Sequence, residues 1–237
     1  MSTVLVPPGA GIVGSIHRLD DEEAHHLRVR RARPDETVAV RDGAGLVGDG
    51  RVRRDGDAWL VEIETVGTAA PPAALVLAAG AGDRGRFAWL LEKAAELGVT
   101  SIVPLETERT AGVATKLRGR HLEKLRRQAL EAIKQSGAPW APSVEEPVEL
   151  SRFLTSLPAG VRWLADVSGG VPPASLGAEP VTVIIGPEGG LTTAERESVV
   201  AAGYHPVKLG AHTLRLETAA IAAAIAVNAA RFRGTDG

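Results

Sequence analysis

Residues 181–224 read VTVIIGPEGGLTTAERESVVAAGYHPVKLGAHTLRLETAAIAAA and contain two glycine turns, each of which follows a predicted strand. The apolar run Val181 to Ile185 predicts a buried strand, and the turn Gly186 to Gly190 follows it directly. Leu209-Gly210 forms the second turn, ahead of an alanine-rich helix. Because glycine has no Cβ, a ligand can approach the main chain closely at such turns. We therefore expect one pocket here, built largely from main chain.

This segment continues an alternation of strands and helices that begins near residue 75. The predicted strands are 75–79, 101–104, 161–165, 181–185 and 206–209, and the predicted helices are 87–97, 119–135, 193–202 and 216–232. Alternation of this kind indicates an α/β fold with a parallel sheet and helices on both faces. Thr192 and Glu195 form a capping-box pattern at the start of the third helix. In the second helix the expected buried stripe is Leu122, Leu125, Ala129 and Ile133.

Residues 1–70 form a different, β-rich unit. Its short strand-like runs are 37–40, 50–53 and 59–63. Asp42-Gly43 and Asp55-Gly56 separate these runs, and Asp-Gly between such runs is a strong hairpin signal. Residues 21–31 predict a short helix. Small residues and prolines at 68–73 indicate a linker, so we expect domains at 1–70 and 74–237.

Composition excludes several classes of protein. The chain is 44% hydrophobic and 24% charged, as is usual for a globular protein, and it has no cysteine. Disulfides, thiolate metal sites and cysteine nucleophiles are therefore excluded. Apolar runs are much shorter than the roughly 20 residues of a membrane helix, and the first residues lack signal-peptide features, so we expect a cytoplasmic protein that does not enter a membrane. The six histidines show no ligand spacing, and we expect no metal.

Positive charge is concentrated locally, although the formal net charge is only -2. A basic block between residues 109 and 134 contains Arg109, Lys116, Arg118, Arg120, Lys124, Arg126, Arg127 and Lys134. Such a block indicates either a nucleic-acid site or a solvated helix face. On the predicted helix 119–135, we expect Lys124, Arg127 and Lys134 to point outward. A second cluster, His25-His26 with Arg28, Arg30, Arg31 and Arg33, leaves the same two alternatives open.

The first glycine turn does not suit phosphate. It lacks the lysine and hydroxyl of a nucleotide-binding P-loop, and Glu188 would repel an anion. A neutral or zwitterionic ligand, such as a nucleoside with an amino-acid tail, suits it better; the alternative is a tight structural turn. Gly80 to Gly85 matches the GxGxxG pattern of dinucleotide sites, which is a weak signal in a glycine-rich chain.

Six motifs stand out together: Glu96 to Val99, Ile102 to Pro104, Glu108 to Thr110, Gln128 to Ser136, Ile185 to Gly190, and Leu209 to Ala219. In combination they resemble the RsmE family, whose members use S-adenosylmethionine to methylate N3 of a uridine in 16S ribosomal RNA. The resemblance covers essentially the whole chain. It implies a SPOUT-type parallel sheet with a C-terminal trefoil knot, preceded by a small PUA-like β-barrel that binds RNA. The pattern by itself predicts an unknotted doubly wound sheet, since knots are rare.

The resemblance also implies a cofactor site and partners. Three loops around the knot would bind S-adenosylmethionine, through Leu164, Ala165, Ile185, Gly186, Pro187, Glu188, Gly189, Gly190, Leu209, Gly210, Leu214 and Arg215. The implied partners are 16S ribosomal RNA or the small ribosomal subunit, and a second copy of the chain in a homodimer. The RNA site would lie near the dimer interface.

Methylation at N3 of uridine requires the loss of a proton, and the resulting anion spreads onto two carbonyl oxygens. Arg109 and Arg215 are candidates for stabilising this anion or for gripping phosphate. Glu217 and Glu188 are candidates for the base, although helix capping alone also explains Glu217. The catalytic candidates are thus Arg109, Arg215 and Glu217. The residues expected to contact RNA are Arg28, Arg30, Arg31, Arg109 and Arg127.

Two positions depart from the family pattern. Leu216 stands where relatives usually have threonine, which removes a hydroxyl, and Gly137-Ala138 stands where an arginine commonly follows Gln135-Ser136. Two functional alternatives stay open. One is a non-catalytic RNA-binding factor with a vestigial pocket, and the other is a nicotinamide-dependent oxidoreductase that uses Gly80 to Gly85.

Overall fold

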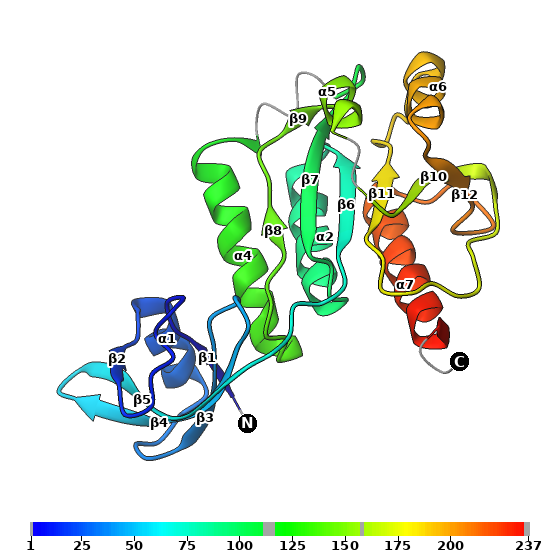
Figure 1. Ribbon diagram of the computed structural model, residues 1–237. Coiled ribbons are helices and arrows are strands. Elements are labelled where there is room, and N and C mark those ends of the chain that lie inside the picture. Colours follow the sequence, from blue (N-terminus) through cyan, green and yellow to red (C-terminus); the bar gives the residue numbers. More distant parts are fainter. Residues whose placement is uncertain (1, 111–116, 157–158, 235–237) are drawn as a thin grey trace. The chain divides into compact units, whose positions relative to one another are not determined.

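The computed structural model describes residues 2–110, 117–156 and 159–234 (Figure 1). These residues form two compact units. The first unit comprises Met1–Pro72 and Leu130–Ala141, and the second comprises Ala73–Ala129 and Pro142–Gly237. The division falls within helix α4 (Arg120–Ser136), whose last turns belong to the first unit. Each unit is described by itself below.

The first unit is a curled five-stranded sheet with helix α1 and the last turns of α4. Its strands follow the order β1-β3-β4-β5-β2, with β1 parallel to β3 and the other neighbours antiparallel. The elements are β1 (Thr3–Leu5), β2 (Ile16–Arg18), α1 (Asp21–Val29), β3 (Thr37–Arg41), β4 (Leu46–Asp55) and β5 (Ala58–Thr68). Alternate apolar side chains, among them Val38, Val40, Val61 and Ile63, form its core with Leu27 of α1.

Both Asp-Gly turns are confirmed. Asp55 pairs with Ala58, so that Gly56 and Asp57 form a two-residue loop, with Gly56 at φ +55°. At the other turn, Oδ1 of Asp42 accepts hydrogen bonds from the main-chain N–H groups of Ala44 (2.7 Å) and Leu46 (3.0 Å). Strands β1 and β2 do not appear among the sequence predictions, because three residues carry too little periodicity to be recognised.

The second unit is an α/β layer structure with a parallel sheet. Its strands follow the order β12-β10-β11-β6-β7-β8, and β9 also pairs with β7. The strands are β6 (Leu75–Gly80), β7 (Ser101–Glu106), β8 (Ser143–Val144), β9 (Val148–Glu149), β10 (Val161–Gly170), β11 (Val181–Ile185) and β12 (His205–Val207). The other helices are α2 (Arg84–Glu96), α5 (Leu150–Thr155), α6 (Thr193–Ala201) and α7 (Leu216–Gly234). The parallel sheet is confirmed, and the trefoil knot stays a prediction.

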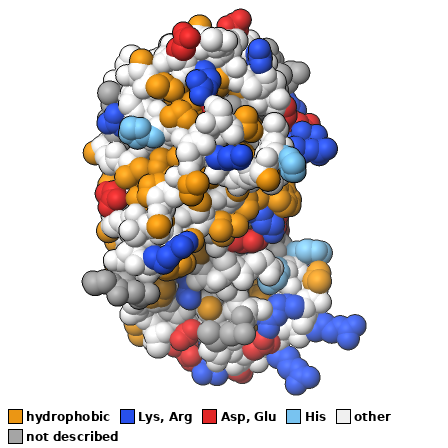
Figure 2. All heavy atoms as spheres, turned by 90° about the vertical axis from the view of Figure 1, so that its right-hand side faces the viewer, with side chains coloured by type: hydrophobic (Ala, Val, Ile, Leu, Met, Phe, Trp, Pro, Cys, Tyr) orange, Lys and Arg blue, Asp and Glu red, His pale blue; other side chains and the backbone are white. Residues whose placement is uncertain are grey.

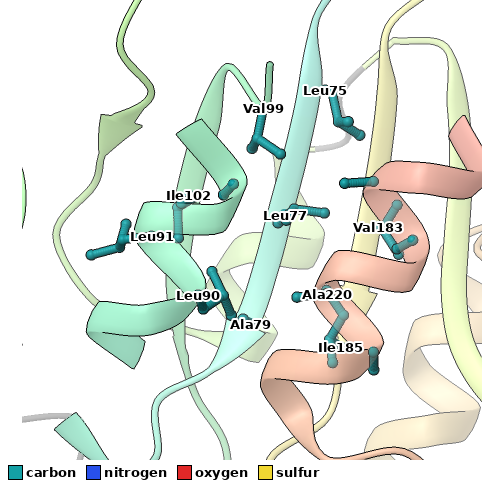
Figure 3. Close-up of a cluster of buried hydrophobic side chains, with 14 of the residues drawn as sticks. Leu75, Leu77, Ala79, Leu90, Leu91, Val99, Ile102, Val183, Ile185 and Ala220 are labelled. Carbon is teal, nitrogen blue, oxygen red and sulfur yellow. The ribbon is translucent and has the colours of Figure 1, made fainter. Parts of the chain in front are cut away.

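Helices cover both faces of this sheet, as the near-continuous apolar strands require. Along β11, Val183 and Ile185 point into the cluster under α2, α4 and α7. Figure 3 shows these two side chains beside Leu77, Leu90 and Ala220. The intervening Ile184 points into the opposite cluster, which includes side chains of α5 and α6. Every residue of β11 is therefore buried, and the strand leads directly into the first glycine turn.

The structure confirms most of what the sequence predicts for helix α4. Its expected stripe of Leu122, Leu125, Ala129 and Ile133 is buried. The prediction that Lys134 points outward is wrong, because α1 packs against the last turns of α4. The Lys134 ammonium lies 2.6 Å from Oε1 of Glu23 on α1, and only 8% of its side chain is exposed.

Candidate active site

A cavity of about 730 Å³ opens at the carboxyl ends of β10 and β11, beside the start of α7. Cavities of this size hold small-molecule ligands and cofactors. Its wall contains every residue that the resemblance assigned to the cofactor site, from all three loops. It also contains Arg86, Asp166, Val167, Leu191, Arg196, His212, Thr213, Leu216 and Ala219. The structure thus brings together segments that lie more than forty residues apart in the chain.

The first glycine turn packs against the strand β6 and the loop that follows it. A Cβ on Gly80 would lie 2.5 Å from the main-chain nitrogen of Pro187, and a Cβ on Gly82 would lie 2.4 Å from Oε2 of Glu188. The space left by these two glycines is therefore filled by the Gly186 to Gly190 turn. Asp83 caps α2 by accepting a hydrogen bond from the N–H of Arg86. This packing argues against a dinucleotide phosphate at the GxGxxG match.

Arg109 contacts the same turn from outside the cavity. Its guanidinium donates a hydrogen bond to the carbonyl oxygen of Gly189, and a Cβ on Gly189 would lie 3.2 Å from its Cδ. Arg109 is not among the residues that line the cavity. The structure thus places this catalytic candidate against the back of the glycine turn.

The second half of β10 forms the third part of the wall, and the loop expected after Ala165 is part of this strand. Pairing between β10 and β12 is interrupted between Ala165 and Gly170. Oδ1 of Asp166 accepts hydrogen bonds from the N–H (2.8 Å) and the hydroxyl (2.6 Å) of Ser168, and Oδ2 accepts one from Nε of Arg196 (2.6 Å). Burial raises the pKa of Asp166, but these hydrogen bonds and the charge of Arg196 outweigh it and leave the pKa below its ordinary value.

Asp166 and Arg196 are cavity residues that sequence reasoning missed. A usable signal did exist for Asp166, since ligand contacts of open α/β sheets lie just beyond the carboxyl ends of strands. Arg196 carried no such signal, because its contact with Asp166 depends on how α6 packs. The neighbouring capping box of Thr192 and Glu195 is confirmed.

The second glycine turn and the start of α7 complete the wall. A Cβ on Gly210 would lie 3.2 Å from a methyl carbon of Leu214, so glycine lets this loop fold back on itself. Arg215 lines the cavity with an exposed side chain. Glu217 lies outside the wall, and its Oε2 is buried without a hydrogen-bond partner among the described residues. Leu216 is 3% exposed and gives the wall an apolar surface at this position.

Glu188 is the acidic group of the first turn. Its Oε1 lies 3.7 Å from Nη1 of Arg86, and both side chains line the cavity. An anionic and a cationic group therefore stand side by side in the same wall.

The basic block is only partly available to a partner. Arg118 bonds to Glu106 (2.7 Å), Arg126 bonds to Glu123 (2.9 Å), and Lys134 is buried. The exposed basic side chains of this block on α4 are Arg120, Lys124 and Arg127. Lys116 lies outside the described residues.

The second basic cluster, around Arg28 to Arg33, is also only partly exposed. Arg28 and Arg31 are exposed, and Arg31 has a positive φ of 58° just after α1. Arg30 forms an ion pair with Glu36. Two of the three arginines expected to contact RNA in this unit therefore face solvent.

The described residues contain no group of three or more His, Cys, Asp or Glu that could hold a metal ion. Among the helices of the described ranges, none is both long and apolar enough to cross a membrane.

Comparisons with known proteins agree over nearly the whole chain. The family model of the RNA methyltransferase domain matches residues 69–228, and that of the RNA methyltransferase PUA domain matches residues 19–64. Ribosomal RNA small subunit methyltransferase E of Aquifex aeolicus is 30% identical over 218 residues, which are 88% of this chain and 92% of that protein. The protein of the same name from a Synechocystis species is 31% identical over 242 residues, 97% of this chain and 78% of that one.

A solved structure matches this chain and belongs to a protein of the same name as these two relatives. The crystal structure of ribosomal RNA small subunit methyltransferase E from Neisseria gonorrhoeae, bound to S-adenosyl methionine, matches with a TM-score of 0.83 and 28% identity. The match covers 95% of this chain and 96% of that one. The parallel sheet, the cavity at its carboxyl edge and these matches lead to one conclusion: this chain belongs to the ribosomal RNA small subunit methyltransferase E family.

Proposed function

We propose that this protein transfers the methyl group of S-adenosylmethionine to N3 of a uridine in 16S ribosomal RNA. One observation carries the proposal: three loops, two of them built around glycine turns, form the wall of one 730 Å³ cavity in a chain of this family. The Neisseria relative contains S-adenosyl methionine, which supports the choice of cofactor.

The residues of the cavity fit this cofactor. Apolar side chains of Leu164, Ile185 and Leu214 suit a purine base, and the main chain of the glycine turns offers donors and acceptors to polar edges. The cofactor's amino-acid tail carries an ammonium and a carboxylate. Glu188 and Arg86, with charged atoms 3.7 Å apart, present the two complementary charges. When bound, the cofactor supplies an electrophilic methyl group.

Arg215 and Glu217 are the groups that we assign to the uracil. Arg215 lines the cavity with an exposed guanidinium, which stabilises negative charge on the carbonyl oxygens beside N3. Glu217 follows two residues later, and its Oε2 is buried without a described partner outside the cavity wall, so it can accept the N3 proton only after the side chain moves toward the cavity. Glu188 is the other candidate for the base. Binding in the cavity orients the two reactants, which supplies part of the rate enhancement.

RNA contacts come, in this proposal, from both units. Residues 1–70 act as a PUA-like RNA-binding domain through Arg28, Arg30 and Arg31, and residues 74–237 act as the methyltransferase domain. Arg127 lies on an exposed part of α4, and Arg109 has guanidinium nitrogens beyond the one that contacts Gly189. The substrate is 16S RNA or the small ribosomal subunit, which places the protein in the cytoplasm.

We further propose that the protein works as a homodimer through its second unit. Figure 2 shows the side that carries α6 and β12, where apolar side chains gather across the second unit. Among the large apolar residues of this unit, Val167, Val171, Ile225 and Phe232 are each more than half exposed. Exposed apolar surface of this kind marks interaction sites. Light scattering coupled to gel filtration tests the dimer, and a monomer at micromolar concentration would contradict it.

Nucleoside mass spectrometry provides the test of activity. Unmodified 16S RNA or small subunits are incubated with protein and S-adenosylmethionine, digested to nucleosides and searched for 3-methyluridine. The proposal predicts 3-methyluridine with the natural protein and a strongly reduced yield with Arg215→Ala. RNA binding without cofactor binding would instead identify a non-catalytic RNA-binding factor.

A further inference from the structure

Glu195, in the first turn of α6, binds two separate segments with its two carboxylate oxygens. Oε2 accepts a hydrogen bond from the N–H of Thr192 (2.8 Å), which is the capping-box contact. Oε1 accepts one from the N–H of Glu108 (2.8 Å), in the loop after β7. A capping box requires only the first of these contacts. The second contact therefore has no role in helix capping.

The loop that Glu195 holds is internally rigid. Thr107 and Thr110 are buried and close it with two hydrogen bonds of 2.9 Å, from the N–H of Thr107 to Oγ1 of Thr110 and from the N–H of Thr110 to the carbonyl of Thr107. Fixing Glu108 within this closed turn also fixes the next residue, Arg109.

Arg109 transmits this constraint to the first glycine turn. Its guanidinium donates to the carbonyl oxygen of Gly189, and its Cδ would lie 3.2 Å from a Cβ at that position. The adjacent Gly190 has φ +72°, and its N–H donates to the carbonyl of Pro187 (2.7 Å). The turn is thus closed by its own hydrogen bond, with Arg109 packed against its outer side.

We propose that Glu195 is a positioning residue for the cofactor cavity. Glu195 is outside the cavity wall. It acts through Glu108 and Arg109, which hold the main chain of Gly189 and Gly190 so that its polar groups face the ligand. The identity of that ligand, S-adenosylmethionine, rests on the proposed function, whereas the conformational effect on the turn does not.

Three substitutions separate positioning from helix capping. Glu195→Ala removes both contacts, and Glu195→Gln keeps one, because an amide has one accepting oxygen and its NH₂ group cannot accept from an N–H. Thr192→Ala is the matched control. It removes the other half of the capping box, the contact from the Glu195 N–H to the Thr192 hydroxyl (3.3 Å), and leaves the Glu195 carboxylate in place.

Amide hydrogen exchange of the ligand-free protein, read by NMR at Gly190, is the direct measurement. We expect Glu195→Ala to speed exchange roughly three- to tenfold, because one modest hydrogen-bonded link to the turn is lost. Arg109→Ala should have a similar effect. Exchange at Gly190 in the double variant should be no faster than in the single variant with the faster exchange, because both residues belong to one chain of contacts.

Calorimetric titration with S-adenosylmethionine adds a second readout. The Kd should rise by the same roughly three- to tenfold in Glu195→Ala, by less in Glu195→Gln, and by much less in Thr192→Ala. Additive effects of Glu195→Ala and Arg109→Ala on exchange, or equal effects of Thr192→Ala and Glu195→Ala, would overturn the proposal. If the natural protein fails to bind S-adenosylmethionine, the proposed function is wrong, and the exchange measurement still decides the role of Glu195.

Discussion

The ammonium of Lys134 lies 2.6 Å from Oε1 of Glu23, and the two side chains are only 8% and 4% exposed. Burial raises the pKa of Glu23 even though Lys134 lowers it. Burial alone would lower the pKa of Lys134, but hydrogen bonds with Glu131 and Glu23 outweigh it and leave that pKa above its ordinary value. A buried ion pair of this kind is costly to break, because the remaining charge has no water around it.

Lys134→Met should therefore destabilise the protein by about 3 kcal/mol at pH 7, since it leaves Glu23 with no cation. The loss should shrink as the pH falls toward 5. Without Lys134, the folded-state pKa of Glu23 rises further, so the folded variant takes up a proton and loses the uncompensated charge. Burial and the charge of Lys134 hold the pKa of His26 below its ordinary value. Removing Lys134 should therefore raise the pKa of His26 as well. Urea unfolding at pH 7 and pH 5 measures this; an equal loss at both pH values would contradict it.

Gly82→Ala should weaken the binding of S-adenosylmethionine about tenfold while leaving the fold intact. The new Cβ would lie 2.4 Å from the carboxylate of Glu188, which is the end of a side chain and can move away from its place in the cavity wall. Gly170→Ala is the matched control, since nothing lies within 4 Å of a Cβ there. Calorimetry and thermal unfolding test both variants. A large fall in Tm for Gly82→Ala would mean that the glycine serves the fold instead.

Arg215→Ala should reduce kcat by about a hundredfold with little change in the Kd of the cofactor, because the proposed charge stabilisation develops only in the transition state. Arg215→Lys should recover part of that loss, since it keeps the charge but not the planar fork of donors. Single-turnover methyl transfer under saturating cofactor gives the rate. A loss confined to the KM for RNA would reassign Arg215 to RNA binding.

Asp166→Asn should cost about 1 kcal/mol of stability at pH 7, a modest value because Arg196 is partly exposed to water. The folded pKa of Asp166 lies below its unfolded value of 3.8. Ionised Asp166 therefore contributes its full stabilisation of the fold when the pH is above the unfolded pKa. This stabilisation is lost as the pH falls through the folded pKa. Natural protein and variant should thus differ at pH 7 and converge in acid, as followed by denaturant unfolding. A difference that persists in acid would show that ionisation of Asp166 is irrelevant.

Leu216→Thr introduces the hydroxyl that the family resemblance implies at this position, and we expect it to destabilise the protein by about 2 kcal/mol. Leu216 is 3% exposed and packs in the core beneath α7, where a hydroxyl would lose water and apolar contacts together. Thermal unfolding and cofactor titration measure the outcome. A stable variant that binds cofactor more tightly would instead indicate a polar role for this position.

Much of the fold follows from local pattern. The apolar strand 181–185, the stripe of α4 and the Asp-Gly turn at residues 55–56 all carry their own signals, and each is confirmed. Strands β8 and β9 have two residues each, and they exist because β7 offers them an edge. Such elements depend on tertiary context, which no short window of sequence contains.

The candidate site also combines features that local sequence predicts with features that depend on tertiary packing. Both glycine turns were predictable, because a missing Cβ beside a strand is a local property. The contact of Asp166 with Arg196 was not, since it joins residues thirty positions apart through the packing of α6. The sequence predicts a functional role for Arg109, which stays a prediction, and its contact with Gly189 appears only once the loop after β7 is placed beside the turn.

The cavity depends on nearby positions that carry no side chain as well as on the side chains in its wall. Every residue offers a main-chain carbonyl acceptor, and every residue except proline offers a main-chain N–H donor, so such contacts do not depend on which side chain the residue carries. An added Cβ would collide with the main chain of Pro187 at Gly80, would displace the Glu188 carboxylate at Gly82, and would strain a backbone with φ +72° at Gly190. We therefore expect the shape of the pocket to depend on keeping these three places empty.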